Sequence, residues 1–404
     1  MEIYDSRYFV HAKRFQELLG FWPYQSRLKN NCSWVILSFL FIAMIIPQIV
    51  GLSVHAGIDS KKTLECTFGT CYMLAIYMKL LVACADKDKA KFIFECTARN
   101  FKKINDNDER KILIEYSERG RLIGLVYTIF VLAALGVFVA VPLAPGILDV
   151  ILPLENGKRS KFFILNGEFL VDKSEYFIEI YAFDSICCIV TVLIICATDP
   201  LYAAILEHCL AIFAIVKLRL RKYRVRKGLK CLSADEAEYE AIIRAVQLHR
   251  EIIALKTIQN NCSFYFAFEM GVTLISFTAN FVLAVLKTPD LFDRLRLAMI
   301  LFAQAVHLFY IMWPGQKLID HGEDLFKETN GKKIFSYQRY FNDWYKSSIK
   351  CQKALRFMSL RCSKPCKLSG AGVYVLNFAY TLMILKTSAS YITVVAQFEY
   401  KIVA

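Results

Sequence analysis

Seven long apolar stretches constrain the fold of this chain more than any other feature of its sequence. A helix needs about 20 predominantly apolar residues to cross the hydrocarbon core of a bilayer. Stretches suited to this task cover residues 34–54, 63–85, 122–145, 177–198, 262–286, 297–316 and 372–398. Hydrophobic residues make up 56% of the chain and its mean hydropathy is +0.39, above the values of typical soluble domains. Because a backbone in lipid must satisfy its own hydrogen bonds, the sequence predicts an all-α membrane protein with seven transmembrane helices.

Lysine and arginine are unevenly distributed among the connections between these spans. Short cytoplasmic segments collect both residue types. The segment before the first span and the connections 86–121, 217–261 and 317–371 carry 38 of the 50 Lys and Arg residues, whereas the alternate connections and the tail carry 10. This distribution predicts a cytoplasmic N-terminus and an extracellular C-terminus. The net charge of +14 is then a property of the cytoplasmic face, and it does not require a nucleic-acid partner.

The segments outside the spans predict a layer of helices in the cytoplasm. In residues 1–33, six apolar side chains fall near one face of a helix that lies along the inner interface: Tyr8, Phe9, Ala12, Phe15, Leu18 and Leu19. The composition of 86–121 and 207–228 indicates spans that continue beyond the bilayer. A polar and aromatic segment at 335–368 predicts a further helix, for which the alternative is a solvated loop. The chain therefore divides into the N-terminal segment, six spans (34–316), a cytoplasmic anchor region (317–371), and a last span with a short extracellular tail (372–404).

The last apolar stretch keeps polar residues along one face. At 100° per residue one stripe contains Met383, Thr387, Ser390, Val394, Gln397 and Phe398, with Lys386 at its margin. Polar groups inside a bilayer are costly unless they face protein or water. The stripe therefore indicates either hydrogen bonding between helices or an aqueous path shared by several copies of the helix. Lys386 either faces that path or pairs with a neighbouring acid or an interface.

Motifs that carry catalytic chemistry are missing from the sequence. It contains no phosphate-binding glycine loop, zinc-helix motif or nucleophile elbow. His208 and His307 stand alone on apolar helices, so we interpret them as structural groups and not as metal ligands. We expect neither an enzyme nor a bound cofactor or metal.

Apolar and aromatic side chains are concentrated in the outer halves of spans two, three, four and six. Such a lining, with a few polar groups, is typical of a cavity for a small ligand. The candidate ligand-binding residues are Phe68, Cys71, Tyr72, Phe138, Val141, Phe177, Ile180, Tyr181, Met299, Phe302 and Ala303. The alternative for each of them is ordinary packing in a helical bundle.

Several motifs of the chain resemble those of insect odorant receptors. They are "LLGFWP" at 18–23, "EHCLAIFAIVKLRL" at 207–220 and "RCSKPCKLSGAGVYVLNFAYTLMILKTSASYITVV" at 361–395. The resemblance extends over the whole chain in length and layout, and it is most specific toward the C-terminus. It implies seven helices with a cytoplasmic N-terminus, in agreement with the distribution of Lys and Arg.

The resemblance also implies a ligand-gated cation channel whose four subunits pack through cytoplasmic helices and line one pore with the last helix. Ser390, Val394, Gln397 and Phe398 match the family's pore-lining pattern, although Phe398 replaces a more usual aliphatic residue. Thr387 lies on the same stripe. The family's shared co-receptor (Orco) has a large insertion between spans four and five that this chain lacks.

This difference implies a subunit that binds a small volatile odorant and assembles with the co-receptor in a heterotetramer. The resemblance places such a subunit in the plasma membrane of an olfactory sensory neuron dendrite, in contact with membrane lipid. One alternative is a gustatory receptor channel, because "SYITVVAQF" at 390–398 is close to the signature of that related family. A second alternative, from another class, is a G-protein-coupled receptor.

Overall fold

The fold is described by a computed structural model of the chain. It covers residues 2–85, 87–153, 159, 163–165, 167–228, 235–261, 263–284, 291–330, 348–364 and 366–403. Within these ranges, side chains are not described at 2, 85, 223–228, 235–238, 253–261, 291–293, 330, 392 and 395–403.

Six helices in the described part of the chain are long and apolar enough to cross a bilayer. They are α2 (Arg27–His55), α3 (Ser60–Ala85), α5 (Asn107–Ala140), α7 (Phe177–Gly228), α9 (Ser263–Val282) and α10 (Leu291–Asn330). The predicted all-α membrane fold is therefore confirmed. The seventh predicted span corresponds to α12 (Phe378–Val403), and the side chains of its last turns lie outside the described residues. The count of seven spans and the orientation stay predictions.

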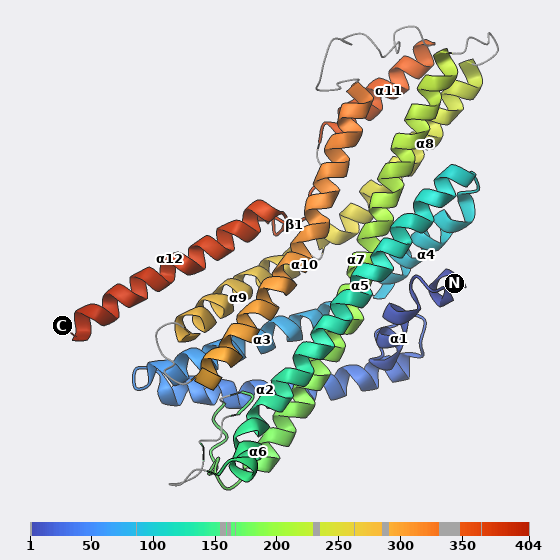
Figure 1. The fold of residues 1–404 in the computed structure, drawn as a ribbon. Helices are drawn as coiled ribbons and strands as arrows, with labels where there is room; N and C mark the ends of the chain where they lie inside the picture. Colours follow the sequence, from blue (N-terminus) through green and yellow to red (C-terminus); the bar gives the residue numbers. More distant parts are fainter. Residues whose placement is uncertain are drawn as a thin grey trace.

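The helices form one elongated bundle (Figure 1). The most extensive contact joins α5 to α7, and α3 packs against both α2 and α9. Small residues allow α5 to approach α7 closely, because a Cβ at Gly120 would lie 3.2 Å from Ala204 Cα and one at Gly124 would lie 3.1 Å from Pro200 Cβ. This is the small-residue spacing that brings membrane helices together. In Figure 1, α12 lies at the edge of the bundle, beside α9.

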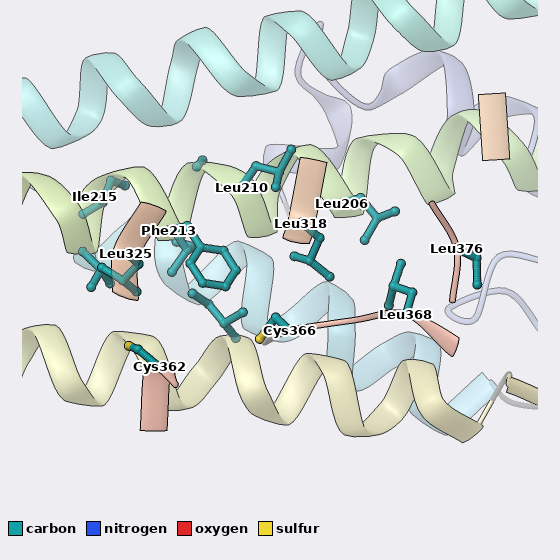
Figure 2. Packing of buried hydrophobic residues seen from close by; sticks show 14 of the residues in the cluster. Leu206, Leu210, Phe213, Ile215, Leu318, Leu325, Cys362, Cys366, Leu368 and Leu376 are labelled. Atoms are coloured by element: carbon teal, nitrogen blue, oxygen red, sulfur yellow. The ribbon is translucent and has the colours of Figure 1, made fainter. Parts of the chain in front are cut away.

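Helices longer than a bilayer requires build a second layer at one end of the molecule. With 52 and 40 residues, α7 and α10 exceed the roughly 20 residues that cross a membrane. Their extensions pack with α8 (Asp235–Asn261) and α11 (Ile349–Cys362). Figure 2 shows part of the shared core, formed by Leu206, Leu210, Phe213, Ile215, Leu318, Leu325, Cys362, Cys366, Leu368 and Leu376. The assignment of this layer to a cytoplasmic anchor region stays a prediction, and residues 331–347 lie outside the described residues.

The N-terminal segment folds onto the side of this bundle. It comprises η1 (Glu2–Asp5) and α1 (Val10–Leu18), and α1 packs against α7. Tyr4 donates a hydrogen bond to the Phe94 carbonyl of α4 (Lys87–Lys103) at 3.0 Å, and burial raises the pKa of the Tyr4 hydroxyl. Of the six apolar side chains predicted to share one face, Phe9, Ala12 and Leu19 are buried within the chain, whereas Leu18 is 61% exposed, and the position of this face at the inner interface stays a prediction. Gln16 is buried instead, because its amide donates to the Ala197 carbonyl at 3.1 Å.

A short hairpin connects α11 to α12. Its strands, β1 (Ser369–Gly370) and β2 (Tyr374–Val375), pair antiparallel. The predicted last span included residues 372–377, but α12 begins only at Phe378, because Asn377 Oδ1 accepts a hydrogen bond from the Tyr380 amide at 2.9 Å and caps the helix. The Ala371 amide donates to the Ser263 carbonyl at 3.0 Å. The hairpin is therefore tied to the start of α9.

Gly315 on α10 allows the hairpin to pack against that helix. A Cβ at this position would lie 2.4 Å from the Leu376 carbonyl oxygen. We expect Gly315→Ala to destabilise the chain by about 1–3 kcal/mol through overpacking, measured as a lower melting temperature of the purified protein in detergent. Gly271→Ala on α9 is the matched control, because a Cβ there has no neighbour within 4 Å. Equal melting temperatures for the two variants would contradict this packing argument.

Candidate ligand cavity, pore helix and a buried ionic network

Three of the predicted ligand-binding residues meet at one hydrophobic cluster. Tyr72 of α3, Phe138 of α5 and Tyr181 of α7 all pack against the cluster that contains buried Cys187 and Cys188. The Tyr181 hydroxyl donates to the Val139 carbonyl at 2.9 Å, which fixes this ring against α5. Three helices far apart in sequence thus each contribute one aromatic ring to the margin of the same hydrophobic cluster.

The connection before α7 closes one end of this cluster. It follows η2 (Val141–Leu143) and α6 (Ala144–Ile151), and it inserts Ile164 and Leu165 into the same core. The Glu168 amide donates to the Pro47 carbonyl at 2.8 Å, and the Glu168 carboxylate accepts from Lys173 Nζ at 2.9 Å. Burial opposes ionisation of Glu168, but the hydrogen bonds and positive charges of Lys173 and His55 together outweigh it, so the pKa of Glu168 is lowered. The connection is therefore anchored by charge as well as by packing.

The remaining candidates occupy varied positions around the cluster. Two stacked pairs, Phe68 with Tyr72 and Phe177 with Tyr181, have ring centroids 6.1 and 6.2 Å apart. Cys71, Val141 and Ala303 are half-buried, and Ile180 is buried. On α10, Met299 and Phe302 are 37% and 64% exposed, and the Phe302 ring contacts Phe130 of α5 at 5.9 Å. The α10 candidates thus lie toward the outside of the bundle, whereas those of α3, α5 and α7 converge.

Two crevices in the described structure lie elsewhere. One of about 50 Å³ is found between α1, α5 and α7, and one of about 390 Å³ between the extensions of α5, α7 and α10. Neither is lined by a candidate ligand-binding residue.

The last helix contacts its own chain along a narrow face. Ile384 and Ser388 of α12 are buried, and Thr278 Oγ1 of α9 donates to Ser388 Oγ at 3.0 Å. The neighbouring predicted stripe is more open, because Thr387 is half-buried and Ser390 and Val394 are exposed. Lys386 is also exposed, and its carbonyl accepts a hydrogen bond from Ser390 Oγ at 3.0 Å.

Most of the described stripe therefore faces away from the chain's own bundle. Gln397 and Phe398 belong to α12, but their side chains lie outside the described residues. Ser388, which makes the contact to α9, was not singled out by the sequence, because the period of the helix placed it beside the stripe and not within it.

A network of charged side chains lies inside the apolar bundle. Lys79 Nζ of α3 donates to the Asp199 carboxylate of α7 at 2.8 and 3.0 Å, and it lies 3.4 Å from Glu269 Oε1 of α9. His307 of α10 bridges the carboxylates, with Nε2 3.4 Å from Glu269 Oε1 and Nδ1 3.5 Å from Asp199 Oδ2. The Tyr127 hydroxyl of α5 lies 3.2 Å from Asp199 Oδ2 and 2.6 Å from His307 Nδ1.

This network joins five helices at one depth of the bundle. The Lys79, Asp199 and Glu269 side chains are 4%, 7% and 2% exposed, so their charges are removed from solvent. Buried charges require partners of opposite sign because desolvation costs several kcal/mol per ion. His307 has hydrogen-bonding partners, as expected for a structural histidine, and buried His208 contacts Asn100 Nδ2 at 3.3 Å. Among the described residues no group of three His, Cys, Asp or Glu side chains is arranged to hold a metal ion.

The sequence contains a signal for this network. Lys79, Asp199 and Glu269 lie within or at the end of apolar stretches. Ionisable residues within membrane spans are rare and usually paired or functional. Their partners could not be assigned from sequence, because the three residues belong to different helices whose relative rotation is set by packing.

The bundle of long apolar helices defines the chain as a helical multi-pass membrane protein. A family model described as 7tm Odorant receptor matches residues 63–389. The chain therefore belongs to the 7tm odorant receptor family. No curated protein sequence matches it.

Solved structures of an insect olfactory receptor share this fold. Olfactory receptor OR5 from Machilis hrabei, in complex with eugenol, superposes with a TM-score of 0.76 at 14% identity, covering 97% of this chain and 100% of that chain. A second structure of the same receptor gives a TM-score of 0.73 at 13% identity, covering 98% and 99% of the two chains. The resemblance inferred from the sequence motifs is confirmed at the level of family and fold.

Removing the cation of the network tests its contribution to stability. We expect Lys79→Met to lower the free energy of unfolding by about 3–5 kcal/mol, because two buried carboxylates lose their charged partner. Lys62→Met is the matched control, since Lys62 is 54% exposed and 3.9 Å from Asp59, a surface pair of about 0–1 kcal/mol. Thermal unfolding in detergent measures both variants. Similar losses for both would show that the network contributes no more than a surface pair.

Proposed function

We propose that this odorant receptor is the ligand-binding subunit of a ligand-gated, non-selective cation channel. The observation that carries the proposal is the match of residues 63–389 to the odorant receptor family. In this proposal the chain assembles with the co-receptor (Orco) in a heterotetramer, in the plasma membrane of an olfactory sensory neuron dendrite. The N-terminus is cytoplasmic, the C-terminus is extracellular, and the layer formed by α7, α8, α10 and α11 packs subunits together in the cytoplasm.

The ligand in this proposal is a small volatile molecule held between the rings of Tyr72, Phe138 and Tyr181. These rings supply apolar contact area, and the Cys187 and Cys188 side chains lie in the same core. Recognition then depends mainly on shape and apolar contact, which suits a volatile compound with few polar groups. The related receptor solved with eugenol supports a ligand of this kind. Phe68, Cys71, Val141, Phe177, Ile180, Met299, Phe302 and Ala303 form the outer part of the proposed cavity.

The pore in this proposal is lined by α12 of each subunit. Support comes from the open side of that helix, where Ser390 and Val394 are exposed beside Thr387. Val394 and Phe398 form an apolar constriction that closes the path by dewetting, and Gln397 offers a polar ring to a passing ion. The family match favours the odorant receptor over the gustatory and G-protein-coupled alternatives.

Recording currents tests the proposal directly. The chain is expressed alone, the co-receptor alone, and the two together, and a panel of volatile compounds is applied to each. We expect dose-dependent cation currents from the pair that neither chain gives alone. A response that requires a G protein, or a panel-independent current, would contradict the proposal.

Substitutions in the aromatic cluster separate ligand binding from permeation. We expect Tyr181→Ala and Phe138→Ala to raise the half-maximal odorant concentration by about tenfold, equivalent to 1.4 kcal/mol, with unchanged relative cation permeability. Phe39→Ala on α2 is the matched control, since this phenylalanine is 70% exposed on the bundle surface. The cavity assignment fails if the cluster variants alter permeability and leave the dose-response curve in place.

A further inference from the structure

The hydrogen bonds around His307 favour one protonation state of the buried network. Nε2 faces Glu269 Oε1 at 3.4 Å, and Nδ1 faces the Tyr127 hydroxyl at 2.6 Å. The same hydroxyl can donate to Asp199 Oδ2 at 3.2 Å, but it carries a single hydrogen. If both ring nitrogens carry protons, Nε2 donates to Glu269, Nδ1 donates to Tyr127, and Tyr127 donates to Asp199. A neutral ring leaves either Asp199 without its tyrosine donor or a nitrogen lone pair facing the Glu269 carboxylate.

The charges of the network lead to the same assignment. Asp199 and Glu269 bring two negative charges and Lys79 brings one positive charge. A protonated His307 balances them, whereas a neutral ring leaves a net negative charge in a medium where charge interactions are strong. Four tyrosines complete the surroundings from α5, α7, α9 and α10: Tyr127, Tyr202, Tyr265 and Tyr310. Tyr310 donates to the Asp199 carbonyl at 3.2 Å.

His307 is also the most exposed member of the network. Its side chain is 24% exposed, whereas those of Lys79, Asp199 and Glu269 are 7% exposed or less. The ordinary range in which histidine titrates, about pH 5 to 8, covers the conditions a cell surface meets.

The network adjoins the proposed cavity, and α9 connects it to the proposed pore helix. Tyr127 and Tyr310 belong to the hydrophobic cluster against which the Tyr72, Phe138 and Tyr181 rings pack. On the other side, α9 carries Glu269 and, nine residues later, Thr278, which donates to Ser388 of α12. A change in the attraction between His307 and Glu269 therefore acts on the helix that holds α12.

We propose that the Lys79–Asp199–Glu269–His307 network is a proton-sensitive coupling site, in which protonation of His307 sets how readily ligand binding moves α9 and the attached pore helix. This inference rests on the proposed function, whose regulation it describes. The proton binds to the His307 ring, which lies between Asp199 and Glu269. It brings the net charge of the network to zero, and it is released as the pH rises.

Odorant dose-response curves at different pH values test the coupling. For the pair with the co-receptor, we expect the half-maximal odorant concentration to change by at least about fivefold between pH ~5.5 and ~8. His307→Gln should lose this dependence and stay near the high-pH value, because its side chain holds no charge. His307→Lys should also lose it, but near the low-pH value. The double variant His307→Gln, Glu269→Gln restores charge balance with Lys79 and Asp199, so it should return toward the low-pH value.

Two other histidines provide controls for this titration. His321 also joins α10 to α5 through a tyrosine, because its Nε2 lies 3.0 Å from the Tyr116 hydroxyl. Its Nδ1 faces the Lys317 carbonyl at 2.9 Å and not a carboxylate. His55 also lies beside a carboxylate, 3.3 Å from Glu168, so its protonation is the alternative source of a pH-dependent response. We expect His321→Gln and His55→Gln to retain the pH dependence. Burial lowers the pKa of His249 to about 4, so this histidine stays neutral over the tested range. The co-receptor alone is recorded at each pH to subtract its own response.

A pH-dependent response that persists in His307→Gln, or that disappears in His55→Gln, overturns the proposal. So does a double variant that behaves like His307→Gln alone. If the chain and the co-receptor expressed together give no odorant current at any pH, the proposed function is contradicted. The inference about the network is then tested separately on the purified chain. Its melting temperature should fall as the pH rises from about 5.5 to 8, because the proton that balances the network is lost. A fall of the same size in His307→Gln overturns the inference.

Discussion

The bundle depends on the ion pair between Lys79 and Asp199 and on its extension to Glu269. Apolar surfaces of membrane helices specify their rotation weakly, because lipid tails solvate them as well as a neighbouring helix does. A charged side chain specifies rotation strongly, since a helix turned by one residue would point that charge about 100° away from its partners. The 2.8 Å contact of Lys79 with Asp199 and the 3.4 Å contact with Glu269 therefore fix α3, α7 and α9 relative to one another. Tyr127 and His307 extend the same constraint to α5 and α10.

The long helices are continuous from the membrane-spanning bundle into the second layer. Near the middle of the bundle, Gly124 of α5 packs on Pro200 of α7, one residue beyond the Asp199 carboxylate. Further along α7, Leu210 and Phe213 enter the core shared with α10 and α11, away from the apolar spans. The same helix therefore runs from the network into the second layer. Successive segments of α7 contribute residues to the aromatic cluster, to the network and to this core.

The sequence predicted the class and most of the spans because apolar length and helical period depend only on local composition. The stripe on the last helix stays a prediction, because Ser390 and Val394 are exposed but so are Leu382, Leu385 and Tyr391 on other faces. It missed the start of α12, because the hairpin residues 373–376 (VYVL) are as apolar as the span and join it without a break, so the cap at Asn377 was placed inside the span. It missed the partners of Lys79, since a contact between residues 120 positions apart is set by tertiary packing. Convergence of Tyr72, Phe138 and Tyr181 at one cluster likewise required the arrangement of three helices.

The attachment of α12 follows from these constraints on α9. The hairpin ties the start of α12 to the start of α9 through the Ala371 amide and the Ser263 carbonyl. Farther along, Thr278 and Ser388 join the same two helices at 3.0 Å. Glu269 lies on α9 between these two attachment points, so the network holds the segment from which α12 is positioned. Since α12 buries only a narrow face against its own chain, its position is determined by α9 together with α10, where the Phe378 amide donates to Gln316 Oε1 at 3.4 Å. Glu269 and His307 of the network belong to these same two helices.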